Sequence, residues 1–575
     1  MIPRLTIFFL FLAPSFAGSQ VLFTSPLPDG ILQVHGDHAD MRVRVAVPGY
    51  PYFIYKLSSN IDTSNFQEGW DSISVQNGMV DTLLTVPKSL VNYALYWRTG
   101  TSSTDTGWRV AGLTPGHIIG IAGQSNAVGH VWPDSGVFVA VPDGDIRMLI
   151  NDTFWQRAGE PTDGEGQGPW IEMANELSAS IGDTLPIGIV NTAVDGTGLT
   201  VSIGSGRWLK TDTSDTMYPD AIDRFRHAGS ELDYFTWIQG EADGEGAELI
   251  DPNVYRTQFD TLIHDFWSDL QNTFPIFHLQ ISGYAGPTNS SATYPQVREA
   301  LRVLPPSTLV GTAVGRSLGD SAFHYTVSTY QAVGRMFAGA ILKELYGIST
   351  SMYPPLMPDT AATLDSITDG SIAGRYCFSI GFTRGGKTVK LTSLTPVQYF
   401  GLNSNGVSLD TSAVWFRISP TDSSRVQIGL RNDSITPKDN YWLVTYDAVA
   451  DGEHAPLATI DPVSGDTIFA MAFYELPVQL ATGPPADVSE FSFQSAAPNP
   501  TSNAIQCYIL SYKHETMTID VVNNLGLTFR HETAVVDEGE QIVTVSTEGL
   551  LSGNYWIVLR DENGNASVQK AVFFH

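Results

Sequence analysis

The middle of the chain alternates short apolar runs with longer amphipathic stretches, which restricts the folds open to it. Between residues 111 and 350, HIIGIA, IGIVNTA, YFTWIQG, IFHLQIS and TLVGTAVG are typical of strands, whereas PWIEMANELSAS, VYRTQFDTLIHDFWSDL and TVSTYQAVGRMFAGAILKEL are typical of helices. Strands that alternate with helices form parallel sheets whose faces the helices cover. We therefore predict an α/β domain with a parallel sheet.

Small and polar residues follow the predicted strands. GQSN begins at Gly123, VDGTG begins at Val194 and QGEAD begins at Gln239, while Asp320 and His324 follow the last strand. Ligand sites of open α/β sheets lie beyond the carboxyl ends of the strands. We therefore expect a functional site at this edge.

Ser125 is a candidate nucleophile, although serine at such a position also caps helices. A serine nucleophile needs a histidine that accepts its proton and donors that stabilise the oxyanion. His324, the backbone N–H of Gly196 and the side-chain amide of Gln239 supply these groups at the strand ends. Together they indicate nucleophilic catalysis.

A chain of 575 residues is too long for a single core. Short strand-like runs fill residues 18–110 and return after MYPPLMP, and a second break, TGPPADVSE, precedes the last block. We predict small Ig-like β-sandwiches on both sides of the α/β domain. The expected parts are residues 1–17, 18–110, 111–350, 359–482 and 490–575.

The N-terminus is typical of a secretory signal peptide. Arg4 precedes the apolar LTIFFLFLAP, and small residues at Ser15 and Ala17 fit a cleavage site after residue 17. No later stretch is long enough to span a bilayer. We therefore expect an exported protein without a membrane span.

Charge and cysteine content bear on partners and cofactors. The chain has 31 Lys and Arg against 60 Asp and Glu, a net charge of −29, which disfavours nucleic acid as a partner. Cys377 and Cys507 either form an inter-domain disulfide or remain unpaired. No Cys/His cluster has zinc spacing, so we expect no metal.

These strand-end motifs resemble a known family. GQSN, AVDGTGL, WIQGEAD and a late aspartate with HYT are similar to the SGNH hydrolase superfamily, and GQGPWIEMANEL and RWLK point to its sialate O-acetylesterase and acetylxylan esterase branch. The resemblance covers residues 111–350. It implies a flavodoxin-like three-layer α/β/α domain that requires no cofactor.

The resemblance also implies residue roles. Ser125 would be the nucleophile, and its N–H, the N–H of Gly196 and the amide of Gln239 would form the oxyanion hole. His324 would act as general base and then as general acid, with Asp320 orienting its ring.

Two departures from the family pattern bear on these roles. Asp320 and His324 are separated by one residue more than in the usual D-x-x-H, so Glu241, Asp243 or a backbone carbonyl remain alternatives for orienting His324. Asp195 stands where the family has glycine, and its carboxylate would oppose an oxyanion if it pointed inward.

Other residues of the motifs are expected to be structural. Glu241 and Asp243 would hold a loop by accepting N–H bonds, and Asn126 would brace the turn. Trp237 is expected in the core, and Trp208 either lines a pocket or packs.

The C-terminal block carries a second resemblance. SAAPNP, TIDVVNNLGL and GLLSGNYWIVLRDENGNASVQKAVFF are similar to the C-terminal sorting domain of the type IX secretion system. The resemblance implies transport across the outer membrane by the type IX machinery and a secreted or cell-surface location. The alternative is an Ig-like appendage that binds carbohydrate.

The sequence predicts a secreted carbohydrate esterase that hydrolyses O-acetyl esters of sugars, with sialic acid or a plant polysaccharide as substrate. The alternative is a catalytically inactive glycan-binding surface protein, which the irregular Asp320–His324 spacing and Asp195 favour. A lipase or thioesterase would need long apolar acyl-binding stretches. The sequence predicts no oligomeric state.

Overall fold

The protein divides into two compact units, residues 1–479 and residues 480–575, which we describe separately. The predicted signal peptide and Asp320 lie outside the residues that the structure describes. The computed structural model describes residues 21–59, 70–88, 92–98, 108–130, 142–159, 167–181, 185–200, 206–212, 217–245, 250–282, 294–319, 324–366, 376–391, 400–404, 407–408, 414–430, 442–446, 457–461, 463–464, 466–479, 491–497, 504–511, 513–523, 528–547, 550, 553–561 and 566–573.

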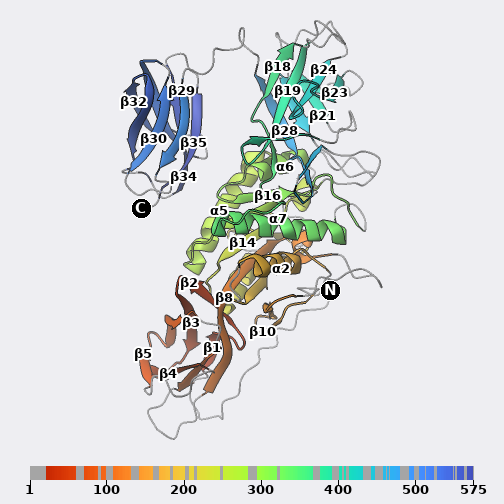
Figure 1. Cartoon of the computed structure of the whole chain (residues 1–575). Helices are drawn as coiled ribbons and strands as arrows, with labels where there is room; N and C mark the ends of the chain where they lie inside the picture. Colours follow the sequence, from red (N-terminus) through yellow and green to blue (C-terminus); the bar gives the residue numbers. More distant parts are fainter. Residues whose placement is uncertain are drawn as a thin grey trace. The chain divides into compact units, whose positions relative to one another are not determined.

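A parallel sheet lies at the centre of the first unit (Figure 1). Its strand order is β9-β11-β8-β14-β15-β16, and β10 adds an antiparallel strand at the β9 edge. The strands that follow β8 in sequence therefore lie on both of its sides, with β11 on one side and β14 on the other. The order of the strands reverses direction at β8. The strands are β8 (Trp108–Gly123), β9 (Ile146–Ile150), β10 (Phe154–Arg157), β11 (Ile187–Asn191), β14 (Tyr234–Ile238), β15 (Ile276–Gln280) and β16 (Thr308–Thr312).

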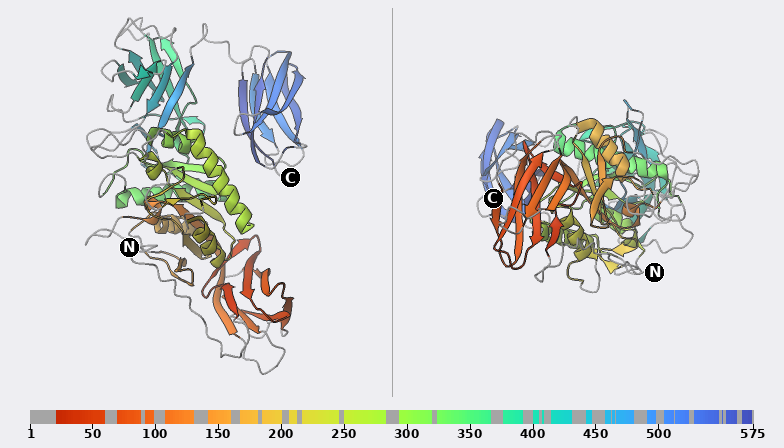
Figure 2. Two further views of the ribbon diagram at one scale, coloured as in Figure 1. Left: turned by 180° about the vertical axis from the view of Figure 1, so that it is seen from behind. Right: turned by 90° about the horizontal axis from the view of Figure 1, so that it is seen from below.

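Helices cover both faces of this sheet. On β8, Ile119 and Ile121 pack in one core with α2 (Trp170–Ile181) and α7 (Val327–Tyr346), which lie side by side in Figure 1. The alternate residues Ile118 and Ala122 belong to a second core on the opposite face. That core includes α3 (Met217–His227), α5 (Pro252–Leu270) and α6 (Tyr294–Arg302), and the view from behind in Figure 2 shows α5.

The parallel strands and helices agree with the α/β prediction for this block, whereas the flavodoxin-like and Ig-like classes stay predictions. The elements β9, β10, α3 and α6 were not predicted from the sequence. The helix α6 has only nine residues, and its buried Tyr294, Val297 and Leu301 give too few repeats for a helical period to stand out. The helix α3 carries Pro219 in its first turn.

The N-terminal strands share a core built from Val43, Phe53 and Leu95. The 16-residue strand β8 pairs first with β7 and β2 and then with β11 and β14, so it runs from this region into the central sheet. The expected boundary at residue 110 falls inside β8. The strands are β1 (Leu22–Ser25), β2 (Ile31–His35), β3 (His38–Ala46), β4 (Tyr52–Ser59), β5 (Asp71–Ser74), β6 (Met79–Pro87) and β7 (Tyr93–Arg98).

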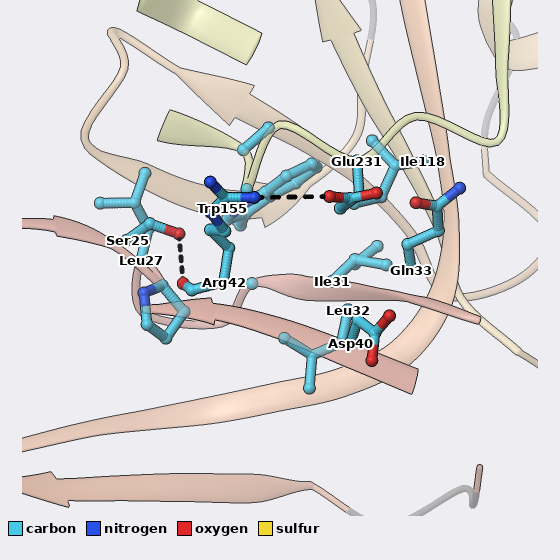
Figure 3. Close-up of a pocket in the computed structure, with 14 residues that line it drawn as sticks. Ser25, Leu27, Ile31, Leu32, Gln33, Asp40, Arg42, Ile118, Trp155 and Glu231 are labelled. Atoms are coloured by element: carbon cyan, nitrogen blue, oxygen red, sulfur yellow. Dashed lines mark hydrogen bonds and ion pairs between the residues drawn. The ribbon is translucent and has the colours of Figure 1, made fainter. Parts of the chain in front are cut away.

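A small cavity lies between these strands and the central sheet (Figure 3). Arg42 pairs with Glu231 at 3.8 Å beside it, and the Ser25 hydroxyl donates to the Arg42 carbonyl at 2.9 Å. The cavity volume of about 10 Å³ is room for a single water molecule. It is therefore a packing feature without space for a sugar.

The strands that follow α7 share a hydrophobic core with it. Leu356, Phe378 and Ile428 belong to the same cluster as Tyr330 and Phe337 of α7. The strands are β17 (Leu356–Pro358), β18 (Ala362–Ser366), β19 (Tyr376–Arg384), β20 (Lys387–Thr388), β21 (Phe400–Ser404), β22 (Val407–Ser408), β23 (Val414–Ile418), β24 (Arg425–Leu430), β25 (Trp442–Tyr446), β26 (Ala458–Ile460), β27 (Thr467–Phe469) and β28 (Phe473–Gln479).

The second unit consists of strands that pair in two sheets, β29-β30-β33 and β32-β31-β34-β35. Ile505, Ile519 and Ile557 contribute to its own core. The strands are β29 (Phe491–Ala497), β30 (Ala504–Ser511), β31 (Glu515–Asn523), β32 (Thr528–Val536), β33 (Gly539–Ser546), β34 (Gly553–Arg560) and β35 (Ala566–Phe573).

Cys377 and Cys507 are both completely buried, and the disulfide between them and two separate thiols both stay predictions. They lie in different units. Burial raises the pKa of the Cys507 thiol to about 12, which keeps it protonated at neutral pH. Among the described residues, no helix combines the length and apolar character that a membrane crossing requires.

Candidate active site

Ser125 lies directly beyond the carboxyl end of β8, the strand at which the sheet order reverses. It is the first residue of the short helix α1 (Ser125–Val128) and is only 7% exposed. Gly123 ends β8 with a φ of +135°, and a Cβ there would lie 2.0 Å from the Ile238 carbonyl oxygen. Glycine is therefore required where the chain turns toward Ser125.

The side chain of Gln124 joins this turn to the end of β14. Its Oε1 accepts hydrogen bonds from the backbone N–H groups of Gly240 at 3.2 Å and Ala242 at 3.0 Å. These groups lie at the start of the short helix α4 (Glu241–Gly244). No role was predicted for Gln124 from the sequence, because the N–H groups that donate to its side chain belong to a distant segment.

The loop after β11 is tied to the end of β8. Val194 N–H donates to the Gly123 carbonyl at 3.1 Å, and the Thr197 hydroxyl donates to the Val194 carbonyl at 2.8 Å. The fully buried Trp208 donates from Nε1 to Thr197 Oγ1 at 2.8 Å, so its role is packing. The predicted oxyanion donor Gly196 lies within this loop with a φ of +65°.

Asp243 holds the continuation of the same loop. Its Oδ2 accepts from Leu199 N–H at 2.9 Å, and its Oδ1 accepts from Thr200 N–H at 2.6 Å. Asp243 accepts N–H bonds as expected, but the loop that it holds is not the one after its own strand, β14. The loop is the one that follows β11.

Gln239 lies completely buried between these loops. Its amide nitrogen lies 2.6 Å from Asp243 Oδ2 and 3.1 Å from the Thr197 carbonyl oxygen, and Tyr255 donates to its Oε1 at 2.7 Å. Both amide hydrogens therefore point into the protein. The role of direct oxyanion donor does not agree with these contacts, and we regard Gln239 as a positioning residue for the two loops.

Asn126 links α1 to α4 and α7. Its Nδ2 donates to Glu241 Oε1 at 2.7 Å, and its Oδ1 accepts from the Tyr330 hydroxyl at 2.9 Å. The bracing role expected for Asn126 is confirmed. Burial raises the pKa of the Glu241 carboxyl to about 7, while the bond from Asn126 acts in the opposite direction.

Asn126 also brings the two ends of the site together. Its Oδ1 accepts from the backbone N–H of Tyr325 at 3.3 Å, across 199 positions of sequence. This bond joins the residue after Ser125 to the residue after His324. Both candidate residues therefore lie at the same edge of the sheet.

His324 lies just before the start of α7. Gly319 N–H donates to the His324 carbonyl at 2.7 Å, and Thr326 caps the helix by accepting from Thr329 N–H at 3.3 Å. Asp320 lies outside the described residues.

His130 contacts both His324 and Asp195, and neither contact was predicted from the sequence. His130 lies with its ring 4.1 Å from the His324 ring, centroid to centroid, at an interplanar angle of 14°. Its Nε2 lies 2.8 Å and 2.9 Å from the two carboxylate oxygens of Asp195. The carboxylate of Asp195 therefore points toward His130.

No group of three or more His, Cys, Asp or Glu side chains could hold a metal ion in the part of the chain that the structure describes. The described residues of the site offer a hydroxyl on Ser125, an imidazole on His324 and backbone N–H donors.

Two family matches cover separate parts of the chain. Residues 115–343 match the family described as carbohydrate esterase, sialic acid-specific acetylesterase. Residues 495–573 match the secretion system C-terminal sorting domain. No curated protein matches the chain.

Among solved structures, a carbohydrate acetylesterase from Xanthomonas citri is 18% identical, with a TM-score of 0.52 over 80% of this chain and 98% of that chain. This likeness concerns the fold. A family two carbohydrate esterase from Clostridium thermocellum is 12% identical over 57% of this chain and 100% of that chain, with a TM-score of 0.26. The last value is too low to support a comparison of folds.

The positions of the two family matches agree with both resemblances seen in the sequence. The first match contains Ser125, Gly196, Gln239 and His324, and the second spans β30 to β35. The chain therefore carries a carbohydrate-esterase domain of the sialic acid-specific acetylesterase family and a C-terminal sorting domain of the type IX secretion system.

Proposed function

We propose that this protein is a secreted esterase that removes O-acetyl groups from carbohydrates with Ser125 as its nucleophile. The observation that carries the proposal is the hydrogen bond between Asn126 Oδ1 and Tyr325 N–H, which brings Ser125 and His324 to one edge of the sheet. The match of residues 115–343 to a carbohydrate-esterase family supports the same chemistry.

In the proposed reaction, Ser125 Oγ attacks the carbonyl carbon of the acetyl ester while His324 accepts its proton. The backbone N–H groups of Ser125 and Gly196 donate to the oxyanion of the tetrahedral intermediate. The sugar hydroxyl leaves with the proton from His324. Water, deprotonated by His324, then attacks the acetyl-enzyme and releases acetate.

The neighbouring residues act by holding these groups in place. Asp320 is proposed to orient the His324 ring. Gly319, the residue before Asp320 in sequence, donates from its N–H to the His324 carbonyl. Gln239 and Asp243 hold the loops on either side of the oxyanion hole.

The esterase match supports the proposed substrate class, and the sorting-domain match supports the proposed location. An O-acetylated sugar, on sialic acid or on a plant polysaccharide, is the proposed substrate. The N-terminal signal peptide and the sorting domain at residues 495–573 would direct the protein to the type IX machinery and to the cell exterior or surface.

Turnover by the purified chain tests this function. We expect release of acetate from an aryl acetate and from O-acetylated sialic acid or acetylated xylan, and a fall in kcat of about 10³-fold or more in Ser125→Ala. A folded wild-type protein without turnover would support the inactive glycan-binding alternative. Full turnover by Ser125→Ala would exclude Ser125 as nucleophile.

A further inference from the structure

His130 and Asp195 lie at the candidate active site but have no part in the mechanism above. Asp195 occupies the position where an inward carboxylate would oppose the oxyanion. The structure turns this carboxylate toward His130 Nε2, which lies 2.8 Å and 2.9 Å from its two oxygens. The arrangement removes that conflict.

His130 is held at two points. Its backbone N–H donates to the Tyr330 hydroxyl at 3.3 Å, which connects it to α7. Its ring donates from Nε2 to Asp195, and an acceptor at one ring nitrogen selects the tautomer that carries the hydrogen there. The bond at the backbone and the bond at the ring together fix the orientation of the His130 ring.

This fixed ring lies flat against His324. A centroid separation of 4.1 Å and an interplanar angle of 14° place the two rings in face-to-face contact. A rotation of the His324 ring out of its plane would collide with His130. A general base must keep such an orientation in order to receive a proton from the nucleophile.

We propose that His130 and Asp195 form a positioning pair for His324, an inference that rests on the proposed function. The face of His130 holds the His324 ring in its productive plane. Asp195 fixes His130, and its carboxylate, one ring away, favours the imidazolium that His324 becomes during attack. Among the described residues, the other titratable groups nearby are Tyr325, which follows His324, Tyr330 on α7, and Glu241, which Asn126 connects to both tyrosines. The proposed partner of His324, Asp320, is a further titratable group.

Four variants of the full chain separate the ring contact from the carboxylate: His130→Ala, His130→Phe, Asp195→Asn and the double variant His130→Phe/Asp195→Asn. We expect His130→Ala to lower kcat for an aryl acetate about tenfold, with KM changed less than about twofold. His130→Phe keeps a flat ring and should recover most of this loss. Asp195→Asn should lower kcat more when residue 130 is histidine than when it is phenylalanine, because the carboxylate can hold only the histidine ring.

The pH dependence of activity distinguishes an effect of Asp195 on His324 from a purely structural role. Activity should rise with pH as His324 loses its proton. Without the Asp195 carboxylate the imidazolium is less favoured, so Asp195→Asn should move this rise to lower pH. The matched control is His531→Ala in the second unit. His531 is also bonded to an aspartate, Asp520, at 2.6 Å, and its loss should change neither kcat nor the pH profile.

Reaction of Ser125 with an aryl phosphonate distinguishes the two proposals. The same variants should slow this labelling in the same order even if no tested ester is a substrate. If the folded wild-type protein shows neither turnover nor labelling, the proposed function is wrong and the inference fails with it. If the wild-type protein reacts but His130→Ala matches it in rate and pH profile, the positioning pair alone is refuted.

Discussion

At the scale of single residues, Glu241 is the ionisable group whose environment has the clearest consequence for stability. Burial raises its pKa from 4.5 to about 7. Because the pKa of Glu241 is higher in the folded protein than in the unfolded chain, the contribution of its protonated carboxyl to the free energy of unfolding is present in full below about pH 4.5. It is lost as the pH rises through about 7.

We expect Glu241→Gln to reduce this pH dependence. In the wild type, ionisation of Glu241 should lower the free energy of unfolding by about 3 kcal/mol between about pH 4.5 and pH 8. Urea unfolding followed by tryptophan fluorescence at about pH 5 and pH 8 measures the difference. The control Glu538→Gln, at an exposed site, should keep the wild-type dependence. An unchanged pH dependence in Glu241→Gln would contradict the buried, protonated carboxyl.

Residue types at strand ends were predictable, whereas the direction of several side chains was not. Ser125 and His324 follow strands, so a general rule for parallel sheets places them at one edge. The amide of Gln239 points into the protein because Asp243 and Tyr255 hold it. Asp195 points toward His130. Such directions depend on partners from other elements, which periodicity does not reveal.

At the scale of elements, Gln280 connects the end of β15 to the segment before β28. Its Nε2 donates to the Ala472 carbonyl at 2.8 Å, and its Oε1 accepts from Ala472 N–H at 2.9 Å. Gln280 is completely buried. These two bonds make the later strands part of the structure that supports the central sheet.

We expect Gln280→Ala to destabilise the first unit by about 3 kcal/mol, because it leaves buried backbone groups of Ala472 unpaired. Thermal melting followed by circular dichroism should show a lower Tm. The control Gln76→Ala, at an exposed position, should change stability by less than about 0.5 kcal/mol. Equal Tm values for the two variants would refute this role of Gln280.

Long elements were predictable from periodicity, and short or continuous ones were not. The helices α5 and α7 have 19 and 20 residues and repeat their apolar positions several times. The strand β8 was not recognised as continuous, because Pro115 and Gly116 in its middle are typical of a turn. Pairing with β2 at these two residues keeps the strand extended.

At the scale of the whole molecule, the two units have separate cores. The core around Ile505 and Ile557 contains only residues of the second unit. In contrast, one core joins α7 with β17 to β28, which makes these strands part of the first unit. Composition indicated several domains but did not reveal this shared core, because the contacts form between segments far apart in sequence.

Two truncations test this organisation. A chain that ends at Gln479 should fold and keep the wild-type kcat, because it retains the whole first unit. A chain that ends at Tyr346 should yield little soluble protein, because it lacks Leu356, Phe378 and the other residues that complete the core shared with α7. Soluble, active protein from the shorter chain would contradict the shared core.

The most direct test of the account is to trap the acyl-enzyme. The wild-type protein is quenched with acid during turnover of an acetyl ester, digested and analysed by mass spectrometry. We predict an acetyl group on Ser125 in the wild type, and longer-lived acetylation in His324→Ala if it still forms. Turnover with the acetyl group on another residue, or with no acetyl-enzyme and full activity in Ser125→Ala, would contradict the account.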